Sequence, residues 1–346
     1  MLNDLHTVGT VPLLGLAVLA TLAILAAGTR LTGTADVLAD RTGLGEALVG
    51  GVLLGASTSL SGTVTSVSAA WLGHPDLAFS NAIGGIAVQT SFLALADLVY
   101  RRATLAHAAA STQNVLGNGL LLLMLSIAVL ASFTPPLTVF AIHPASIVLV
   151  VVYIAGLFAL NAEHKRPLWR PVKTRETRED AVEEDARPGL STPRLVLEVG
   201  SLALVLSIAG YTASRVALEA TVRFGIDESV MGALVTATMT STPELVVTLA
   251  AVYRGALHLA VGGIIGGNTY DVLFLTFSDI AYRDGSLYHY VTDATLYWLV
   301  VALVMASLVL TAQVRRELVG LRHIGIESIA IVLLYVLAIG LAVLGP

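Results

Sequence analysis

Long apolar runs, separated by short polar stretches, recur along the whole chain. An apolar run of roughly 20 residues is long enough to cross a bilayer as an α-helix. Ten runs have about this length and cover about 8–29, 44–72, 76–99, 105–131, 138–161, 194–220, 228–253, 257–281, 289–312 and 324–344. Several contain Gly, Pro or polar residues, which a membrane helix tolerates only where protein or a water-filled cavity satisfies the backbone. The pattern predicts an all-α integral membrane protein with ten transmembrane helices.

Composition agrees with this class. Hydrophobic residues make up 56% of the 346 positions and charged residues only 12%, whereas soluble domains carry about 25% charged residues. The chain has no cysteine, which excludes disulfides, thiolate metal sites and iron–sulfur clusters. The first residues lack the basic region of a signal peptide, so we expect the first run to remain as a membrane helix.

The basic residues predict an orientation, because Lys and Arg collect on the cytoplasmic side of membrane proteins. If the charged stretch 162–193 lies inside, only Arg215, Arg223 and Arg283 of the 19 basic residues lie outside. Both termini are then expected to face the exterior, and the protein is expected in the cell membrane of a bacterium or archaeon. The stretch itself passes from basic to acidic and is interpreted as a solvated linker, with a contact to anionic lipid as the alternative.

An internal repeat divides the chain. Residues 41–101 align without a gap to 223–283, an offset of 182, with 19 of 61 positions identical. Polar and glycine positions match in register, such as Thr58-Ser59 with Thr240-Ser241. Repeats separated by five spans have opposite orientations, as in secondary transporters whose substrate binds where the halves meet. We predict helices 1–5 in residues 1–161, a cytoplasmic linker in 162–193 and helices 6–10 in 194–346.

Two carboxylates, Glu244 and Asp271, lie inside apolar runs. An ionisable side chain at bilayer depth is costly and usually faces a bundle interior or wet cavity, where it marks an ion or proton path. The alternative for each is a neutral acid that only packs between helices. These two residues are therefore the first candidates for function.

The surroundings of Glu244 favour cation binding. Thr236, Thr240, Pro243 and Glu244 share one helix face, and Pro243 is expected to free carbonyls near Met239 and Thr240. Together with Ser241, Asn268 and Asp271 they form an all-oxygen set that suits a hard cation such as Na⁺ or Ca²⁺. The glycine pairs 262–263 and 266–267 would let the next helix approach closely. Alternatively, the hydroxyls of Thr240 and Ser241 only bond to their own backbone.

The segment TSTPELV, followed by GGIIGGNTYDVLF, resembles the second α-repeat of the sodium/calcium exchanger family. The resemblance covers nearly the whole chain and implies an antiporter that moves Ca²⁺ or another cation against Na⁺ or H⁺. By match to the motif, Glu244, Asp271, Thr240 and Ser241 take ion-coordinating positions, Asn268 is retained and Gly267 replaces a small hydroxyl residue. The resemblance also implies alternating access through movement of the first and sixth helices, and no cofactor.

The first repeat departs from the motif. Gly62 stands at the glutamate position, Ser61 at the proline and Ile86 at the asparagine. Only Thr58, Ser59 and Gln89 remain as neutral ligands there, so the site has two carboxylates where full-site relatives resemble a three-carboxylate cage. Loss of a carboxylate and of the first-repeat kink is expected to weaken divalent binding, so we predict altered selectivity toward monovalent cations or protons. On this hypothesis Gly62→Glu raises Ca²⁺ affinity.

Other interpretations stay open. A cation channel would use the same ligands, and a degenerate homologue would bind or sense ions without transporting them. Motifs for an enzyme, such as His-Glu-x-x-His, Gly-x-Ser-x-Gly or a phosphate loop, are absent. The expected partners are membrane lipid and inorganic cations, not nucleic acid, and the oligomeric state is unknown.

Residues at the ends of the predicted helices are expected to have structural roles. Glu46 and Glu228 begin equivalent helices and would favour their dipoles. Asp97 and Asp279 each precede Tyr-Arg and are expected to form interfacial salt bridges. His74 is interpreted as an interfacial histidine.

Overall fold

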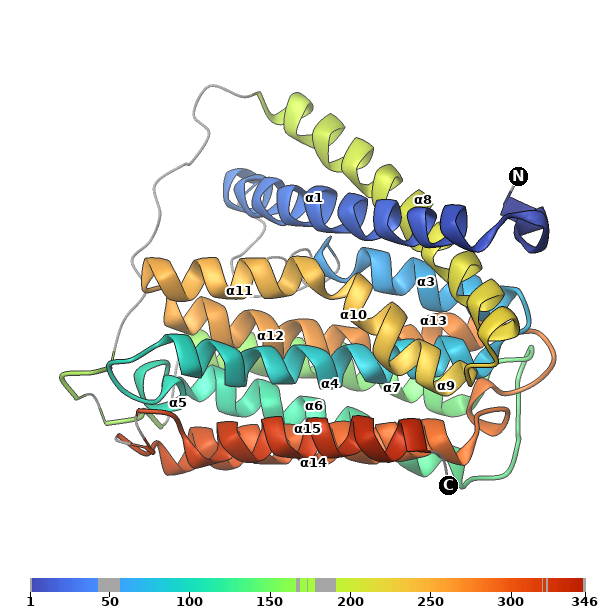
Figure 1. Ribbon diagram of the computed structural model, residues 1–346. Helices are drawn as coiled ribbons and strands as arrows, with labels where there is room; N and C mark the ends of the chain where they lie inside the picture. Colours follow the sequence, from blue (N-terminus) through green and yellow to red (C-terminus); the bar gives the residue numbers. More distant parts are fainter. Residues whose placement is uncertain are drawn as a thin grey trace.

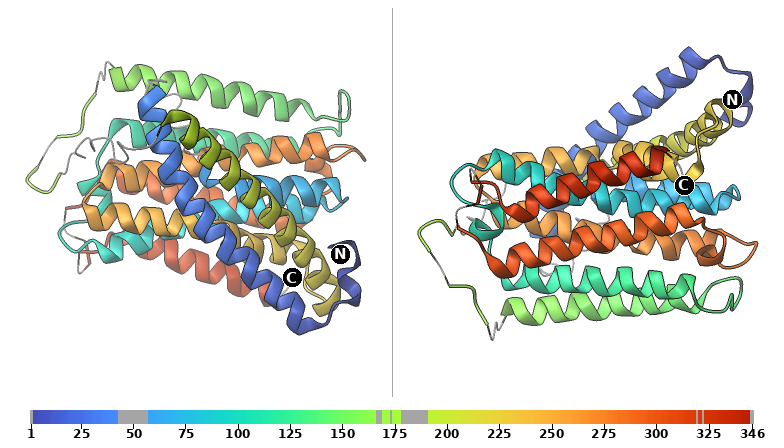
Figure 2. Two further views of the ribbon diagram at one scale, coloured as in Figure 1. Left: turned by 90° about the horizontal axis from the view of Figure 1, so that it is seen from above. Right: turned by 60° about the horizontal axis from the view of Figure 1, so that its bottom comes forward.

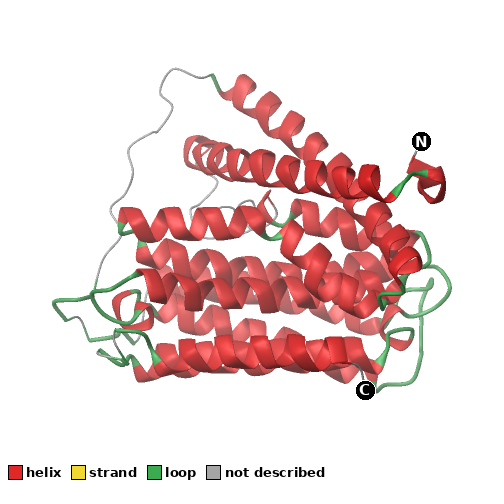
Figure 3. Ribbon diagram, in the orientation of Figure 1, coloured by secondary structure: helices red, strands yellow, loops and turns green. Residues whose placement is uncertain are grey.

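The computed structural model describes residues 2–42, 57–165, 169–172, 174–177, 191–318, 320–321 and 323–344. These residues form helices joined by loops and turns, with no strand segment among them (Figure 3). The first half contains η1 (Leu2–Thr7), α1 (Thr10–Thr42), α3 (Leu60–Trp71), α4 (Pro75–Val99), α5 (Leu105–Ala108), α6 (Thr112–Ser132) and α7 (Pro144–Lys165). The second contains α8 (Thr192–Phe224), α9 (Glu228–Val230), the π-helix η2 (Met231–Thr236), α10 (Ala237–Thr240), α11 (Thr242–Arg254), α12 (Leu257–Asp271), α13 (Leu273–Ala281), η3 (Leu287–His289), α14 (Asp293–Arg315) and α15 (Ile326–Leu344).

The predicted membrane spans can be compared with these helices. Within the described residues, eight helices are long and apolar enough to cross a bilayer, and a bent pair, Glu228–Thr240 with Thr242–Arg254, makes a ninth. They correspond to nine of the ten predicted runs. The remaining run, 44–72, is described only from residue 57 onward, where it contains the 12-residue helix α3. The all-α membrane fold is thus confirmed, while part of the tenth span lies outside the described residues.

The helices form three layers (Figure 1). The middle layer contains α3, α4, the broken helix α9–α11 and the pair α12–α13. One side is covered by α6, α7, α14 and α15, which share the main hydrophobic core with the middle layer. The other side is covered by the long helices α1 and α8, which cross the bundle obliquely (Figure 2) and have separate apolar clusters between them.

The two outer helices touch the middle layer at equivalent glycines. A Cβ atom on Gly28 of α1 would lie 2.6 Å from Cγ of Pro243, and one on Gly210 of α8 would lie 2.7 Å from the carbonyl oxygen of Ser61. The numbers 28 and 210 differ by 182, as do 61 and 243. Each outer helix therefore contacts the interrupted helix of the opposite repeat, and the repeat extends beyond the segment that sequence identity detects.

The carboxylates Asp97 and Asp279 join the two repeats. Oδ1 of Asp97 accepts a hydrogen bond from the backbone N–H of Leu105 at 2.6 Å. Its Oδ2 accepts from the N–H of Gly325 at 2.8 Å and from Oγ of Ser328 at 2.7 Å. Asp97 of the first repeat thus holds the start of α15, which belongs to the second. This role differs from the predicted pairing with arginine.

Asp279 makes the equivalent contacts 182 positions later. Its Oδ1 accepts from the N–H of Leu287 at 2.9 Å, and its Oδ2 accepts from the N–H of His143 and the hydroxyl of Ser146, both at 2.7 Å. Burial lowers the pKa of the His143 imidazole, which keeps this side chain neutral at pH 7. Asp279 of the second repeat therefore holds the start of α7, which belongs to the first.

Replacement of Asp279 by Asn is expected to destabilise the protein by about 3 kcal/mol, because two N–H donors and a hydroxyl lose a charged acceptor. Thermal unfolding of the purified variant in detergent measures this loss. The control is Asp284→Asn, which changes an exposed carboxylate of the next loop. Equal melting temperatures for the two variants would contradict the joining role of Asp279.

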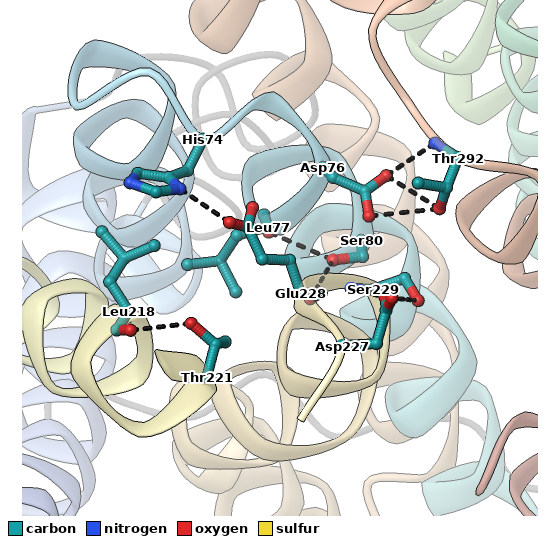
Figure 4. Close-up of polar contacts among 10 residues, drawn as sticks. All are labelled: His74, Asp76, Leu77, Ser80, Leu218, Thr221, Asp227, Glu228, Ser229 and Thr292. Atoms are coloured by element: carbon teal, nitrogen blue, oxygen red, sulfur yellow. Dashed lines mark hydrogen bonds and ion pairs between the residues drawn. The ribbon is translucent and has the colours of Figure 1, made fainter. Parts of the chain in front are cut away.

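The start of the broken helix α9–α11 is anchored to the first repeat (Figure 4). The side chain of Asp227 caps α9 by accepting from the N–H of Ser229 at 2.8 Å. Glu228 does not serve only the helix dipole, since its Oε1 lies 2.7 Å from Nδ1 of His74. Oγ of Ser80 donates to the Glu228 carbonyl at 3.3 Å. These contacts hold this end of the broken helix against the turn between α3 and α4.

Candidate cation-binding site

Both repeats interrupt a helix at the same place. Ser241 separates α10 from α11 with φ −93° and ψ 5°, and the helix axis bends by 48° there. Ser59, the equivalent residue, precedes α3 with φ −89° and ψ 6°. The first repeat thus keeps its interruption although Ser61 replaces the proline. The predicted loss of the first-repeat kink also concerns residues before 57, which lie outside the described part of the chain, so it stays a prediction.

The carbonyls that Pro243 was expected to free are partly satisfied. The Met239 carbonyl accepts from Oγ1 of Thr242 at 3.0 Å, and the Thr240 carbonyl accepts from Oγ of Ser61 at 3.3 Å. The Thr240 hydroxyl donates back to the carbonyl of Thr236 at 3.0 Å. A hydroxyl oxygen that donates in this way keeps lone pairs that can face a cation, so the back-bond and a ligand role are compatible.

Gln89 and Asp271 meet at the centre of the molecule. Nε2 of Gln89 donates to Oδ2 of Asp271 at 2.7 Å and to Oγ of Ser241 at 3.3 Å. The two residues occupy equivalent positions, since 89 and 271 differ by 182. A Cβ atom on Gly85 would lie 3.7 Å from the Ser241 hydroxyl and 3.8 Å from Asp271 Oδ2. The site therefore lies where the two repeats face each other.

The neighbouring glycine and asparagine complete this arrangement. A Cβ on Gly267 would lie 3.3 Å from Oε1 of Gln89, so this glycine allows the close approach that was predicted. Of the other glycines in that segment, Gly262 approaches Asn114, whereas Gly263 and Gly266 have no side-chain neighbour within 4 Å of an added Cβ among the described residues. Nδ2 of Asn268 donates to Oγ1 of Thr90 at 3.0 Å, which leaves the amide oxygen for another partner.

Five buried oxygen atoms in this region have no hydrogen-bond partner within the described part of the chain. They are Oγ of Ser59, Oε1 of Gln89, Oε2 of Glu244, Oδ1 of Asn268 and Oδ1 of Asp271. Each of these residues is at most 5% exposed. An unpartnered buried acceptor costs about 1–3 kcal/mol, and more when it is charged. Carboxylate, amide and hydroxyl oxygens are the ligands that a hard cation prefers, so this donor set fits such a cation.

The structure places all eight predicted ligands in the buried interior. They are Thr58, Ser59, Gln89, Thr240, Ser241, Glu244, Asn268 and Asp271. Hydrogen bonds from the Gln89 amide join it to Ser241 and to Asp271. The Asp271 carboxylate is also close enough to Glu244 for the two to interact electrostatically. Sequence reasoning did not single out Thr90, which holds Asn268, although it directly follows Gln89. It also gave no role to Ser61, which bonds the Thr240 carbonyl.

Asn81 is a further buried polar residue that sequence reasoning missed. Its Nδ2 donates to Oγ of Ser66 at 2.8 Å, and its Oδ1 accepts from Oγ1 of Thr236 at 2.6 Å. The Thr236 hydroxyl is thus used by α4 and does not point freely toward Glu244. Asn81 thus links α3, α4 and η2 on the side of the site that leads toward α9.

The space beside Gly62 is occupied by an aromatic ring. A Cβ on Gly62 would lie 2.7 Å from Cε2 and 3.2 Å from Cζ of Phe274, and 3.7 Å from Oγ1 of Thr240. A glutamate at this position would collide with the ring unless the ring moved. The prediction that Gly62→Glu raises Ca²⁺ affinity therefore requires the Phe274 ring to move or to be replaced by a smaller side chain.

A repeated helical bundle with buried carboxylates and unpartnered oxygens at its helix interruptions defines a membrane transporter for cations. The sequence profile described as "Sodium/calcium exchanger protein" matches residues 12–160 and again residues 195–344. The chain therefore belongs to the sodium/calcium exchanger protein family, which is a family of secondary transporters.

Solved structures of the sodium-calcium exchanger NCX_Mj share the fold. The structure soaked with 100 mM Na⁺ and 10 mM Sr²⁺ is 17% identical, with a TM-score of 0.61 over 96% of this chain and 99% of that chain. The structure soaked with 10 mM Na⁺ and zero Ca²⁺ is 18% identical, with a TM-score of 0.60 and the same coverage. At this identity the likeness shows the fold alone. A comparison with curated protein sequences gives no match.

Proposed function

We propose that the protein is a secondary antiporter that exchanges Ca²⁺ or another cation for Na⁺ or H⁺ at a site formed by Glu244 and Asp271. The observation that carries this proposal is the group of five unpartnered oxygens beside the two helix interruptions. Buried oxygens without partners are rare in folded proteins. That two of them belong to buried carboxylates inside a membrane bundle supports cation binding over a packing role.

Charge limits the cargo. Two carboxylates are neutralised by one Ca²⁺, by two Na⁺ or by two protons, so exchange of one kind for another leaves the site balanced. Because the number of charged ligands strongly affects Ca²⁺ affinity, the neutral residues Gly62 and Gln89 support a selectivity shifted away from divalent ions.

Alternating access is proposed to involve α1 and α8. The apolar contacts between these helices form two small clusters of their own, and α8 joins the main core only near its end, through Ala217 and Leu218. They touch the middle layer through Gly28 and Gly210, next to the interruptions that carry the site. A movement of this pair would expose or cover the ligands from one side of the membrane at a time.

The proposed orientation places the linker in the cytoplasm. Figure 1 shows η1 and the last turn of α15 at one end of the bundle, with the end of α7 and the start of α8 toward the other. Arg101, Arg102 and Arg254 lie at the linker end, around a hollow of about 480 Å³. Since basic residues mark the cytoplasmic side, we infer that both termini face the exterior of the cell membrane.

The test is uptake of ⁴⁵Ca²⁺ into proteoliposomes under an outward Na⁺ gradient and, separately, under a pH gradient. Uptake that depends on one gradient and is lost in Glu244→Gln supports the antiporter and names its coupling ion. The same assay with ²²Na⁺ covers a monovalent cargo. Flux without a counter-ion would indicate a channel, and saturable binding without flux would indicate a sensor. Either result would overturn the proposal.

A further inference from the structure

The fixed negative charge of the site comes from one repeat only. Glu244 and Asp271 both belong to the second repeat, and their equivalents 182 positions earlier are Gly62 and Gln89. The first repeat contributes neutral oxygens and the Gln89 amide, which donates to Asp271. If the two halves were chemically alike, a carboxylate at 62 would form the opposite wall of the site.

Phe274 takes the place of that missing side chain. Its ring lies against Gly62, at the distances given above, and the residue is only 3% exposed. The ring is held edge-to-face by Tyr270, with centroids 6.1 Å apart and planes at 83°. Tyr270 is itself packed edge-to-face on Tyr153 at 6.1 Å. The volume beside Gly62 is thus closed by a row of three aromatic rings.

We propose that Phe274 determines the occupancy of the site, so that the protein binds a single metal cation at a time and exchanges metal cations one for one, or one metal cation for protons. The inference rests on the proposed cation antiport at Glu244 and Asp271. The limit of one ion does not apply to protons, because protons bind covalently to the carboxyl oxygens and need no separate volume.

The volume available at the site, and not its charge, limits the number of metal cations that bind. Two Na⁺ ions would balance two carboxylates, so charge alone permits double occupancy. A dehydrated hard cation needs about six to eight oxygen ligands. The five unpartnered oxygens are fewer than one such shell requires, so they leave none over for a second ion. The side that could hold a second ion presents the carbon atoms of Phe274, which have no lone pairs.

The experiment is a count of ions bound per protein at saturation, with ²²Na⁺ and with ⁴⁵Ca²⁺, on the purified full-length chain. We expect a single ion of either kind and a Hill coefficient near one. Phe274→Leu should admit a second Na⁺ at higher concentration, because it opens space without changing charge. The double variant Gly62→Glu with Phe274→Leu should bind two Na⁺ cooperatively and should bind Ca²⁺ at least about tenfold more tightly.

The matched control is Phe277→Leu, which removes another ring of α13 that also contacts Tyr270. This variant should bind the same number of ions per protein as the wild type. Two or more Na⁺ on the wild-type chain would overturn the inference and leave the antiporter proposal standing. A single Na⁺ on both Phe274 variants would overturn the role of Phe274. Absence of saturable binding for both ions would overturn the proposed function and this inference with it.

Discussion

Replacement of Asp271 by Asn is expected to weaken binding of the transported cation by about a hundredfold, because ligand charge strongly controls affinity for hard cations. Asp271 is one of two acidic groups among the described residues of the candidate site and is 1% exposed, so no nearby solvent replaces its charge. The neutral amide would still meet Gln89 without a clash, so the variant should fold. Equilibrium binding of ²²Na⁺ and ⁴⁵Ca²⁺ to the purified protein measures the loss.

The matched control is Asp76→Asn. Asp76 is also a buried carboxylate, but it accepts hydrogen bonds from the backbone and hydroxyl of Thr292, away from the site (Figure 4). Its replacement should leave cation affinity unchanged within about twofold in the folded fraction. If Asp76→Asn weakened binding as much as Asp271→Asn, the two-carboxylate site would be the wrong explanation.

Replacement of Gly210 by Ala is expected to reduce the transport rate at least about tenfold while the protein still binds its cation. The added Cβ would lie 2.7 Å from the carbonyl oxygen of Ser61 and 3.2 Å from Cβ of Val64. Backbone cannot give way as a flexible side chain can, so α8 must shift away from α3. A shift at this contact changes the movement of α8 but leaves Glu244 and Asp271 in place.

Gly200→Ala is the control on the same helix, because an added Cβ there has no neighbour within 4 Å among the described residues. It should transport at the wild-type rate. The two variants are compared by initial uptake into proteoliposomes and by equilibrium binding. Equal rates for Gly210→Ala and Gly200→Ala would show that the glycine contact of α8 has no part in transport.

Much of the fold followed from periodic features of the sequence. Apolar runs of membrane length located nine spans, and the offset of 182 aligned polar positions such as Thr58 with Thr240. The same offset holds in parts of the chain with little identity: the isolated bridges Val139–Ile142 and Leu321–Ile324 are equivalent. Backbone geometry is shared by the halves even where side chains have diverged, so identity alone underestimated the repeat.

The site was predicted as a set of residues but not as a geometry. Carboxylates in apolar runs are conspicuous, and this identified Glu244 and Asp271. The turn at Ser59 could not be predicted, because the sequence signal for the equivalent turn was Pro243, and Ser61 stands at that position in the first repeat. The placement of Phe274 against Gly62 joins residues far apart in the sequence, and a phenylalanine in a membrane helix gives no signal of its own. Long-range packing therefore set the details that local patterns could not.

The crossed contacts of Asp97 and Asp279 bear on the order in which the chain can assemble. The first turn of α7 depends on Asp279, which leaves the ribosome more than a hundred residues later. Until then, the N–H of His143 and the hydroxyl of Ser146 lack the acceptor that they have in the finished protein. The start of α15 needs Asp97, which is already present when α15 is made. The start of α7 can therefore be fully hydrogen-bonded only after the second half has been made. Each half needs an aspartate of the other half to complete its own helices.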